Sequence, residues 1–154
     1  MPESTIRTYR PADLPAVKGI IDAVELFPSE MLDEMVPGEE DGEGDPGFWL
    51  TGEIDEPVAV ACCEPERMTA GTWNLLLIAV HPSHQDRGIG AKLMRYVETR
   101  LAERGERVLL VETSGTAAFE RTRGFYRRLG YEEAARIREY YDVGDDKVVF
   151  RKAL

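Results

Sequence analysis

The sequence predicts an α+β fold built on one mixed sheet, and three observations lead to this prediction. The spacing of apolar residues gives the element order β-α-α-β-β-β-α-β-α-β-β along 154 residues. Short turns join the strands in the middle of the chain, which indicates an antiparallel meander. A single helix then connects the apolar strand that starts at Trp73 to the strand 107–111, and a one-helix crossover predicts that these two strands are parallel.

The first part of the chain predicts one strand and two helices. Residues 6–9 alternate between apolar and polar and are expected to form a short strand. Asp13 is a favourable N-cap for a helix whose apolar residues, from Leu14 to Val24, recur at helical spacing. Ser29 is expected to cap a second, short helix with an apolar stripe formed by Met31, Leu32 and Met35.

The acidic segment 39–47 follows and contains no apolar residues to bury, which predicts a solvated connector or a rim that attracts cations. Two strands, 48–54 and 58–64, form a hairpin, and the strand that starts at Trp73 completes the meander. The remaining elements are a helix 88–104 ended by Gly105, the strand 107–111, a helix 116–129 ended by Gly130, and two strands, 136–141 and 147–151.

Composition limits the classes of function. The length is that of a single domain, residues 1–154. A net charge of −10 argues against nucleic acid as the main partner. No stretch is apolar enough to cross a membrane and the first residues do not form a secretory signal, so we expect a cytoplasmic protein. The adjacent Cys62 and Cys63 point to opposite faces of a strand, which predicts reduced thiols rather than a disulfide or a metal site.

A phosphate-binding turn is predicted between the central strand and the helix that follows it. Gly88 and Gly90 lack Cβ atoms, so an anion can approach the backbone where the first N–H groups of the helix have no helical partner. No Gly-Lys-Ser/Thr sequence follows, which excludes the Walker pattern, and the third glycine of the dinucleotide fingerprint is missing. A βα turn that uses glycine only for close packing, or another phosphate-loop nucleotide binder, stays open at this point.

The sequence Gln-x-x-Gly-x-Gly after an apolar strand resembles the acetyl-CoA signature of the GCN5-related N-acetyltransferase (GNAT) family. The block 125–131, Phe-Tyr-Arg-Arg-Leu-Gly-Tyr, is similar to a second motif of that family, and the element order also matches. The resemblance implies a GNAT-like sheet whose fourth and fifth strands splay apart. It also implies an enzyme that moves an acetyl group from acetyl-CoA to a primary amine by direct attack in a ternary complex. The alternative is a non-catalytic acetyl-CoA sensor or assembly module.

The resemblance further implies where the co-substrate acetyl-CoA binds, with no metal required. The strand edge at Ile78, Ala79 and Val80 is expected to pair with the pantetheine arm. The pyrophosphate is expected to bind the following turn, formed by Gln85, Asp86, Arg87, Gly88, Ile89, Gly90 and Ala91. The family's asparagine after the fifth strand has no counterpart between Glu112 and Tyr126.

Two residues are candidates for proton transfer. The family motif makes Tyr126 the general acid for the departing thiolate, with a tyrosine in the core as the alternative. Glu112, at the end of its strand, is the best carboxylate for the general base, directly or through water, and otherwise caps the following turn. Asn74 occupies a place where some family members carry a glutamate, and an amide cannot serve as a base.

The acceptor is expected to be a small molecule or a protein amine. Carboxylates and aromatic rings suit the binding of an ammonium group, so such residues are candidates for lining the acceptor site. The alternative is that the carboxylates lie on the surface and the aromatic rings pack in the core. The candidates are Glu25, Phe27, Trp49, Glu139, Tyr140, Tyr141, Asp145 and Asp146. A homodimer is compatible with the resemblance, whereas nucleic acid and membranes are not expected as partners.

Overall fold

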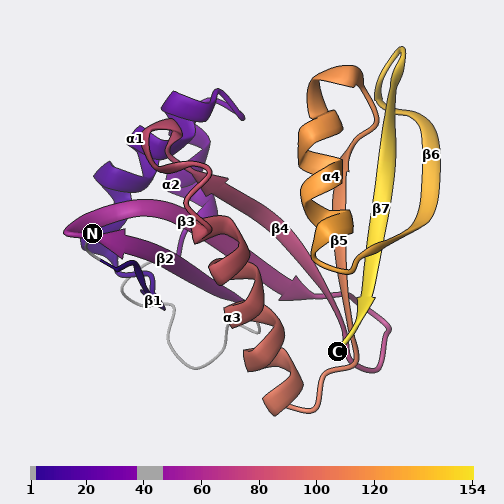
Figure 1. Ribbon diagram of the computed structural model, residues 1–154, viewed down its shortest axis with the longest axis horizontal. Coiled ribbons are helices and arrows are strands. Elements are labelled where there is room, and N and C mark those ends of the chain that lie inside the picture. The colour runs from indigo at the N-terminus through magenta and orange to yellow at the C-terminus, as the bar shows by residue number, and fades with distance from the viewer. Residues whose placement is uncertain (1–2, 38–46) are drawn as a thin grey trace. The chain divides into compact units, whose positions relative to one another are not determined.

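The computed structural model describes residues 3–37 and 47–154, and its helices and strands follow the predicted order (Figure 1). The predicted acidic connector lies almost entirely outside the described residues. The strands are β1 (Thr5–Thr8), β2 (Phe48–Ile54), β3 (Glu56–Pro65), β4 (Thr72–Val80), β5 (Val108–Ser114), β6 (Glu132–Asp142) and β7 (Asp145–Ala153). The α-helices are α1 (Leu14–Val24), α2 (Leu32–Met35), α3 (Ile89–Glu103) and α4 (Glu120–Arg128).

The sheet is mixed, as predicted. Hydrogen bonding joins the strands in the order β1-β2-β3-β4-β5-β7-β6. The ladder between β4 and β5 is parallel and pairs Thr72–Leu75 with Val108–Val111, whereas β1 with β2, β2 with β3, β5 with β7 and β6 with β7 are antiparallel. The strand β4 continues beyond this ladder to Val80, and β5 continues to Ser114. The parallel ladder is therefore shorter than either strand.

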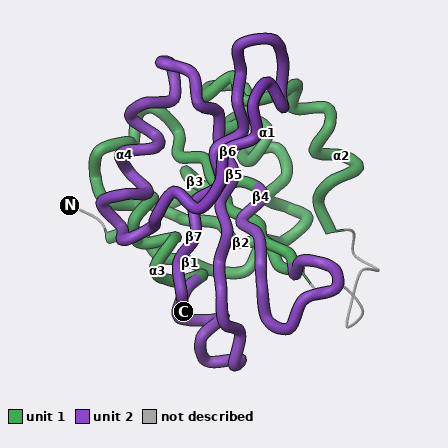
Figure 2. The backbone as a smooth tube through the Cα atoms, turned by 90° about the vertical axis from the view of Figure 1, so that its right-hand side faces the viewer, with its two compact units in different colours: residues 1–64, 77–97 green, residues 65–76, 98–154 purple. Residues whose placement is uncertain are grey.

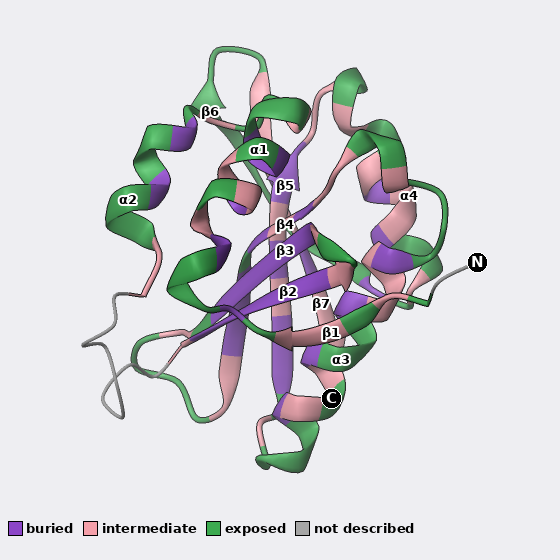
Figure 3. Ribbon diagram, turned by 90° about the vertical axis from the view of Figure 1, so that its left-hand side faces the viewer, coloured by how far each residue is buried: buried purple, intermediate pink, exposed green. Residues whose placement is uncertain are grey.

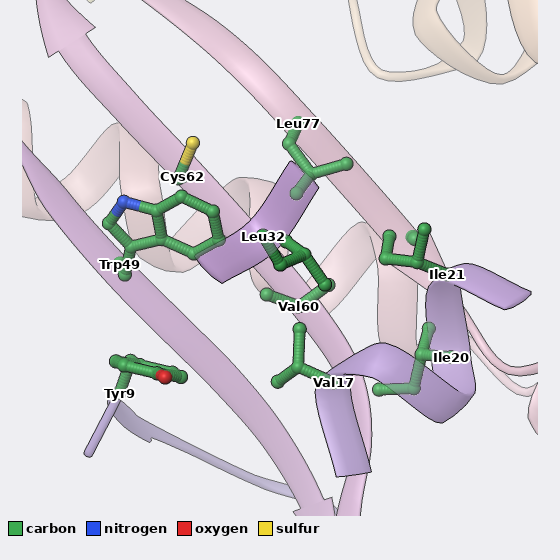
Figure 4. Packing of buried hydrophobic residues seen from close by; sticks show 10 residues of the cluster. Tyr9, Val17, Ile20, Ile21, Leu32, Trp49, Val60, Cys62 and Leu77 are labelled. Atoms are coloured by element: carbon green, nitrogen blue, oxygen red, sulfur yellow. The ribbon is translucent and has the colours of Figure 1, made fainter. Parts of the chain in front are cut away.

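The chain forms two compact units, residues 1–64 with 77–97 and residues 65–76 with 98–154 (Figure 2). The core of the first unit forms where one face of α1 meets β2, β3 and the end of β4 (Figure 4). Its members are Tyr9, Val17, Ile20, Ile21, Leu32, Trp49, Val60, Cys62, Leu77 and Ala79. Full burial of an aliphatic side chain contributes about 1.5–3 kcal/mol, so the helical spacing of these residues in α1 fixes which face of α1 packs on the strands.

Colouring by burial shows that β2 and β3 are buried along most of their length (Figure 3). Both cysteines lie in β3 as buried, reduced thiols, as predicted. Cys62 belongs to the core of the first unit, and Cys63 follows it on the opposite face of the strand. No helix among the described residues is both long and apolar enough to span a bilayer.

Two local predictions in the first unit are wrong. The Asp13 side chain does not cap α1, because its two oxygens accept bidentate hydrogen bonds from Arg7 at 2.8 Å and one also accepts from the Arg10 amide. The predicted apolar stripe of the second helix is reduced to Leu32, since Met31 and Met35 are exposed. A helix of one turn is too short to hide residues on more than a narrow face.

The ion pair of Asp13 gives a prediction about stability and pH. The hydrogen bond from Arg7 holds the pKa of this buried carboxyl below its ordinary value. Its stabilising contribution is therefore complete above the unfolded pKa of about 3.9 and is lost as the pH falls further. We expect Asp13→Asn to lower the free energy of unfolding by about 2 kcal/mol at pH 7 and by much less at pH 3, as measured by urea denaturation.

The matched control is Asp33→Asn, because Asp33 makes an exposed ion pair with Lys18 at 2.8 Å. Exposed pairs contribute at most about 1 kcal/mol. An equal effect of the two substitutions at pH 7 would contradict the assignment of the Arg7–Asp13 pair as a stabilising contact.

The second unit packs α4 against β5 and β7 (Figure 1). The ring of Tyr126 lies 5.7 Å from that of Phe150 and 6.0 Å from that of Tyr131, measured between centroids. All three residues are buried. The strand β5 extends past its predicted end at Val111 and includes Glu112, because β7 pairs with β5 as far as Ser114.

Candidate active site

The first unit carries the predicted phosphate-binding turn. Asp86 and Gly88 have positive φ angles of 63° and 81°. A Cβ added at Gly88 would meet no atom within 4 Å, so glycine there is required by backbone conformation and leaves open space beside the chain. The Gly88 carbonyl accepts a hydrogen bond from the Lys92 amide at 3.0 Å, which makes it the first acceptor of α3.

The amides of Ile89, Gly90 and Ala91 therefore belong to the first turn of a 15-residue helix, where N–H groups have no acceptor within the helix. Ile89 is buried and anchors this end of the helix, while Arg87 is exposed beside it. Backbone N–H groups, the positive end of the helix dipole and an exposed guanidinium together suit a pyrophosphate.

The strand edge predicted for the pantetheine arm ends immediately before this turn. Ala79 is buried in the core of the first unit, whereas Ile78 and Val80 are half-buried. The Gln85 side chain donates a hydrogen bond from Nε2 to the Val80 carbonyl at 3.0 Å. Gln85 therefore braces the turn against the strand, which is a structural reason for glutamine at the first position of the motif.

Two histidines in the same connection make local contacts. Ser83 donates its amide to His81 Nδ1 at 3.2 Å, and its hydroxyl lies 2.8 Å from His81 Nδ1 and 2.9 Å from His84 Nδ1. These contacts shape the short connection after β4.

The second unit carries a polar cluster around Glu112. The Oε1 atom of Glu112 accepts a hydrogen bond from Asn74 Nδ2 at 2.7 Å, and Oε2 pairs with the Lys147 ammonium. Asn74 Nδ2 also donates to Glu66 Oε1 at 2.8 Å. Glu112 keeps about a quarter of its side chain exposed, so a ligand or water can still reach the carboxylate.

Sequence reasoning missed Glu66 and Lys147. The shared face of Asn74 and Glu112 follows from alternation along two adjacent parallel strands. Lys147, however, reaches Glu112 diagonally across the β5–β7 ladder, in which it is paired with Ser114. That contact depends on the register of two strands far apart in the sequence, and no local pattern specifies it.

The lysine is held by more than one group. Burial lowers the pKa of Lys147, but the hydrogen bond and the negative charge of Glu112 raise it by more, so the net direction is upward. Its Nζ also lies 4.1 Å from the centroid of the Tyr140 ring, a cation–π distance. Tyr140 and its neighbour Tyr141 are exposed and lie edge to face.

Tyr126 is buried in the aromatic cluster of the second unit, and burial raises the pKa of its phenol above the ordinary value. The hydroxyl therefore remains protonated throughout the physiological pH range. Tyr131 has a different role, because its hydroxyl donates to Glu98 Oε2 at 2.7 Å. Glu98 also pairs with Lys152 at 2.9 Å, which connects α3, β7 and the end of α4.

The turn after β5 is closed without Glu112. Ser114 Oγ accepts a hydrogen bond from the Thr116 amide at 3.1 Å. Arg123, a buried residue of α4, donates to the carbonyls of Ser114 and Thr116 at 2.8 and 2.7 Å. The alternative role of Glu112 as a cap of this turn is therefore wrong, because its carboxylate is held by Asn74 and Lys147.

Several residues proposed for the acceptor site have other partners. Trp49 is buried in the core of the first unit, and Phe27 packs against the same core. Asp145 accepts from Ser114 at 2.5 Å, and Asp146 accepts from the Glu139 amide at 2.9 Å. Asp145 therefore links the start of β7 to the end of β5, and Asp146 bridges the β6–β7 hairpin.

Comparison with known proteins assigns the chain to a family. A profile of the Acetyltransferase (GNAT) family matches residues 14–131, which include the phosphate-binding turn and Tyr126. The chain belongs to the GNAT family. It is similar to the [ribosomal protein bS18]-alanine N-acetyltransferase of Escherichia coli, with 29% identity over 147 residues that cover 94% of this chain and 91% of the relative.

Solved structures agree. A GNAT-family protein from Desulfovibrio desulfuricans superposes with a TM-score of 0.86 at 29% identity, covering 98% of this chain and 99% of the other. An aminoglycoside 6'-N-acetyltransferase complexed with coenzyme A superposes with a TM-score of 0.69 at 19% identity, covering 97% and 96%. The chain is thus an acetyl-CoA-dependent N-acetyltransferase that acts on amine acceptors, as its sequence predicted.

Proposed function

We propose that this N-acetyltransferase transfers the acetyl group to the α-amine of a peptide or protein N-terminus by direct attack in a ternary complex. The observation that supports this choice is the pairing of Glu112 with both Asn74 and Lys147. A carboxylate that is already engaged by two partners suits an amine that is partly neutral near pH 7.5 and needs little help to lose its proton.

The two kinds of primary amine differ strongly in this respect. At pH 7.5 about a quarter of α-amines with a pKa near 8 are neutral, against about 0.1% of lysine amines with a pKa near 10.4. The E. coli relative is named for an alanine N-terminus, which supports the same acceptor class for this chain.

In the proposed reaction, the amine nitrogen bonds to the acetyl carbon while the bond from that carbon to sulfur breaks. Glu112 accepts the proton that the amine loses, directly or through one water, because a carboxylate has about four acceptor positions and two are used here. Tyr126 donates its proton to the departing sulfur. Burial raises the pKa of a thiol as well as that of a phenol, which keeps the two groups comparable in a desolvated site.

The turn Gln85–Ala91 would hold the pyrophosphate through the amides at the start of α3, and the strand edge Ile78–Val80 would pair with the pantetheine arm. A backbone amide at Ala79 or Val80 is the proposed donor to the acetyl oxygen. A cytoplasmic location is part of the same proposal, because acetyl-CoA is made and used inside cells.

The acceptor class is tested by release of free thiol from acetyl-CoA with three probes. These are a hexapeptide that begins with alanine, the same peptide with an acetylated N-terminus and one internal lysine, and an aminoglycoside. We expect kcat/KM for the alanine peptide to exceed the other two values at least tenfold. A preference for the lysine peptide or the aminoglycoside would overturn the α-amine proposal while leaving the family assignment intact.

A further inference from the structure

Asn74 is a buried amide with an unusual set of partners. Only 4% of the residue is exposed, and its Nδ2 atom donates to Glu112 at 2.7 Å and to Glu66 at 2.8 Å. Each of the two N–H bonds therefore serves one carboxylate. These carboxylates come from different parts of the second unit, since Glu66 precedes β4 and Glu112 lies near the end of β5.

The other end of the same amide lacks a partner. Within residues 3–37 and 47–154, Asn74 Oδ1 is buried and accepts no hydrogen bond. The two hydrogen bonds of this amide are thus obtained at the cost of leaving a buried acceptor unsatisfied. An unsatisfied polar group of this kind calls for another explanation, and the contact with Glu112 supplies one.

We propose that Asn74 is a positioning residue for acetyl transfer, which fixes the orientation of the Glu112 carboxylate, and that Glu66 fixes Asn74 in turn. This inference rests on the proposed role of Glu112 as the base. Rotation of the Asn74 amide would break both charge-assisted hydrogen bonds, each of which contributes about 1.5–3 kcal/mol. The hydrogen bonds to Glu66 and Glu112 thus fix the orientation of the Asn74 amide, and this amide in turn fixes the position of Glu112 Oε1.

Glu66 also has an electrostatic role. The charged and titratable groups around Glu112 are Glu66 before β4, Lys147 on β7, and Tyr140 and Tyr141 on β6. Lys147 places a positive charge beside Glu112, and Glu66 places a second negative charge nearby. A change in either charge therefore alters the electrostatic environment of the proposed base.

Two nearly isosteric substitutions have opposite expected signs. Glu66→Gln keeps an oxygen for Asn74 but removes a negative charge beside the proposed base. Asn74→Asp keeps the shape but removes both donors and adds a negative charge there. The acid limb of the kcat/KM profile should therefore move by about 0.5–1 pH unit to lower pH for Glu66→Gln and to higher pH for Asn74→Asp.

We also expect Asn74→Asp to lower kcat about tenfold, with the KM for acetyl-CoA unchanged. If Asn74 served only the fold, its substitution would lower the melting temperature. The acid limbs of the Glu66→Gln and Asn74→Asp profiles would then not move in opposite directions. The experiment uses the full chain, acetyl-CoA and the best amine of the three probes, with the melting temperature recorded for every variant. Should Asn74→Asp fail to fold, the direction of the shift in Glu66→Gln alone decides.

Two further variants separate the possible failures. Glu132→Gln is the matched control, because Glu132 makes an exposed ion pair with Arg151 at 3.1 Å, and its profile should equal that of the parent protein. Glu112→Gln tests the proposed base. Full activity of Glu112→Gln would overturn the proposed function. If Glu112→Gln is inactive but the acid limbs of the Glu66→Gln and Asn74→Asp profiles do not move, only the proposed role of Asn74 is overturned.

Discussion

Tyr126→Phe is expected to lower kcat about a hundredfold without weakening the binding of acetyl-CoA. The substitution removes one hydroxyl and keeps the ring that packs between Phe150 and Tyr131, so the fold should be retained. Because burial raises the pKa of Tyr126, the hydroxyl holds its proton at every pH at which the enzyme is folded and active. The kcat profile of the parent protein should therefore show no loss of activity from Tyr126 ionisation below pH 10.

Tyr131→Phe is the matched control for this experiment. Tyr131 is equally buried, but its hydroxyl donates to Glu98, and the loss of this hydrogen bond should lower the melting temperature while kcat changes less than twofold. The two variants thus separate chemistry from stability. If Tyr131→Phe lost more activity than Tyr126→Phe, the assignment of the general acid would be wrong.

Gly88→Ala is expected to weaken acetyl-CoA binding about thirtyfold, which corresponds to about 2 kcal/mol. A side chain at this position occupies the open space beside the turn, and alanine disfavours the positive φ of 81° that directs the amides of the helix start. The dissociation constant can be measured by calorimetry with acetyl-CoA in the absence of an acceptor.

Gly105→Ala provides a closely matched comparison. Gly105 has the same φ of 81° and the same open surroundings, but it lies after the C-terminal end of α3. Both variants should lose a similar amount of stability, about 1–2 kcal/mol, and only Gly88→Ala should bind acetyl-CoA less tightly. Equal dissociation constants for the two variants would contradict the phosphate-binding role of the turn.

The elements that sequence reasoning found most accurately are those with a strong local pattern. The strand Phe48–Ile54 has the predicted bounds, and the helix predicted over 88–104 occupies Ile89–Glu103, because alternation and helical spacing of apolar residues operate over a few neighbours. The turn between β4 and α3 was found for the same reason. Its glycines and the preceding strand form one continuous stretch of sequence.

The wrong or missing predictions share a dependence on distant residues. Aspartate is a favourable N-cap residue, but the carboxylate of Asp13 accepts hydrogen bonds from Arg7 on a neighbouring strand instead. Met31 and Met35 are apolar, yet both are exposed. The contacts of Glu112 with Lys147 and of Asn74 with Glu66 were missed because they form only once three strands are in register. Tertiary contacts of this kind override local preference.

The burial of the two adjacent cysteines in β3 has a chemical consequence for an enzyme of this class. Each turnover liberates free coenzyme A, whose thiol forms mixed disulfides with accessible protein cysteines under oxidising conditions. Enclosure within the strand withholds both sulfur atoms from that exchange. Coenzyme A can therefore build up during the reaction without modifying the enzyme covalently. Formation of such a mixed disulfide would first require the core around the two cysteines to unfold locally.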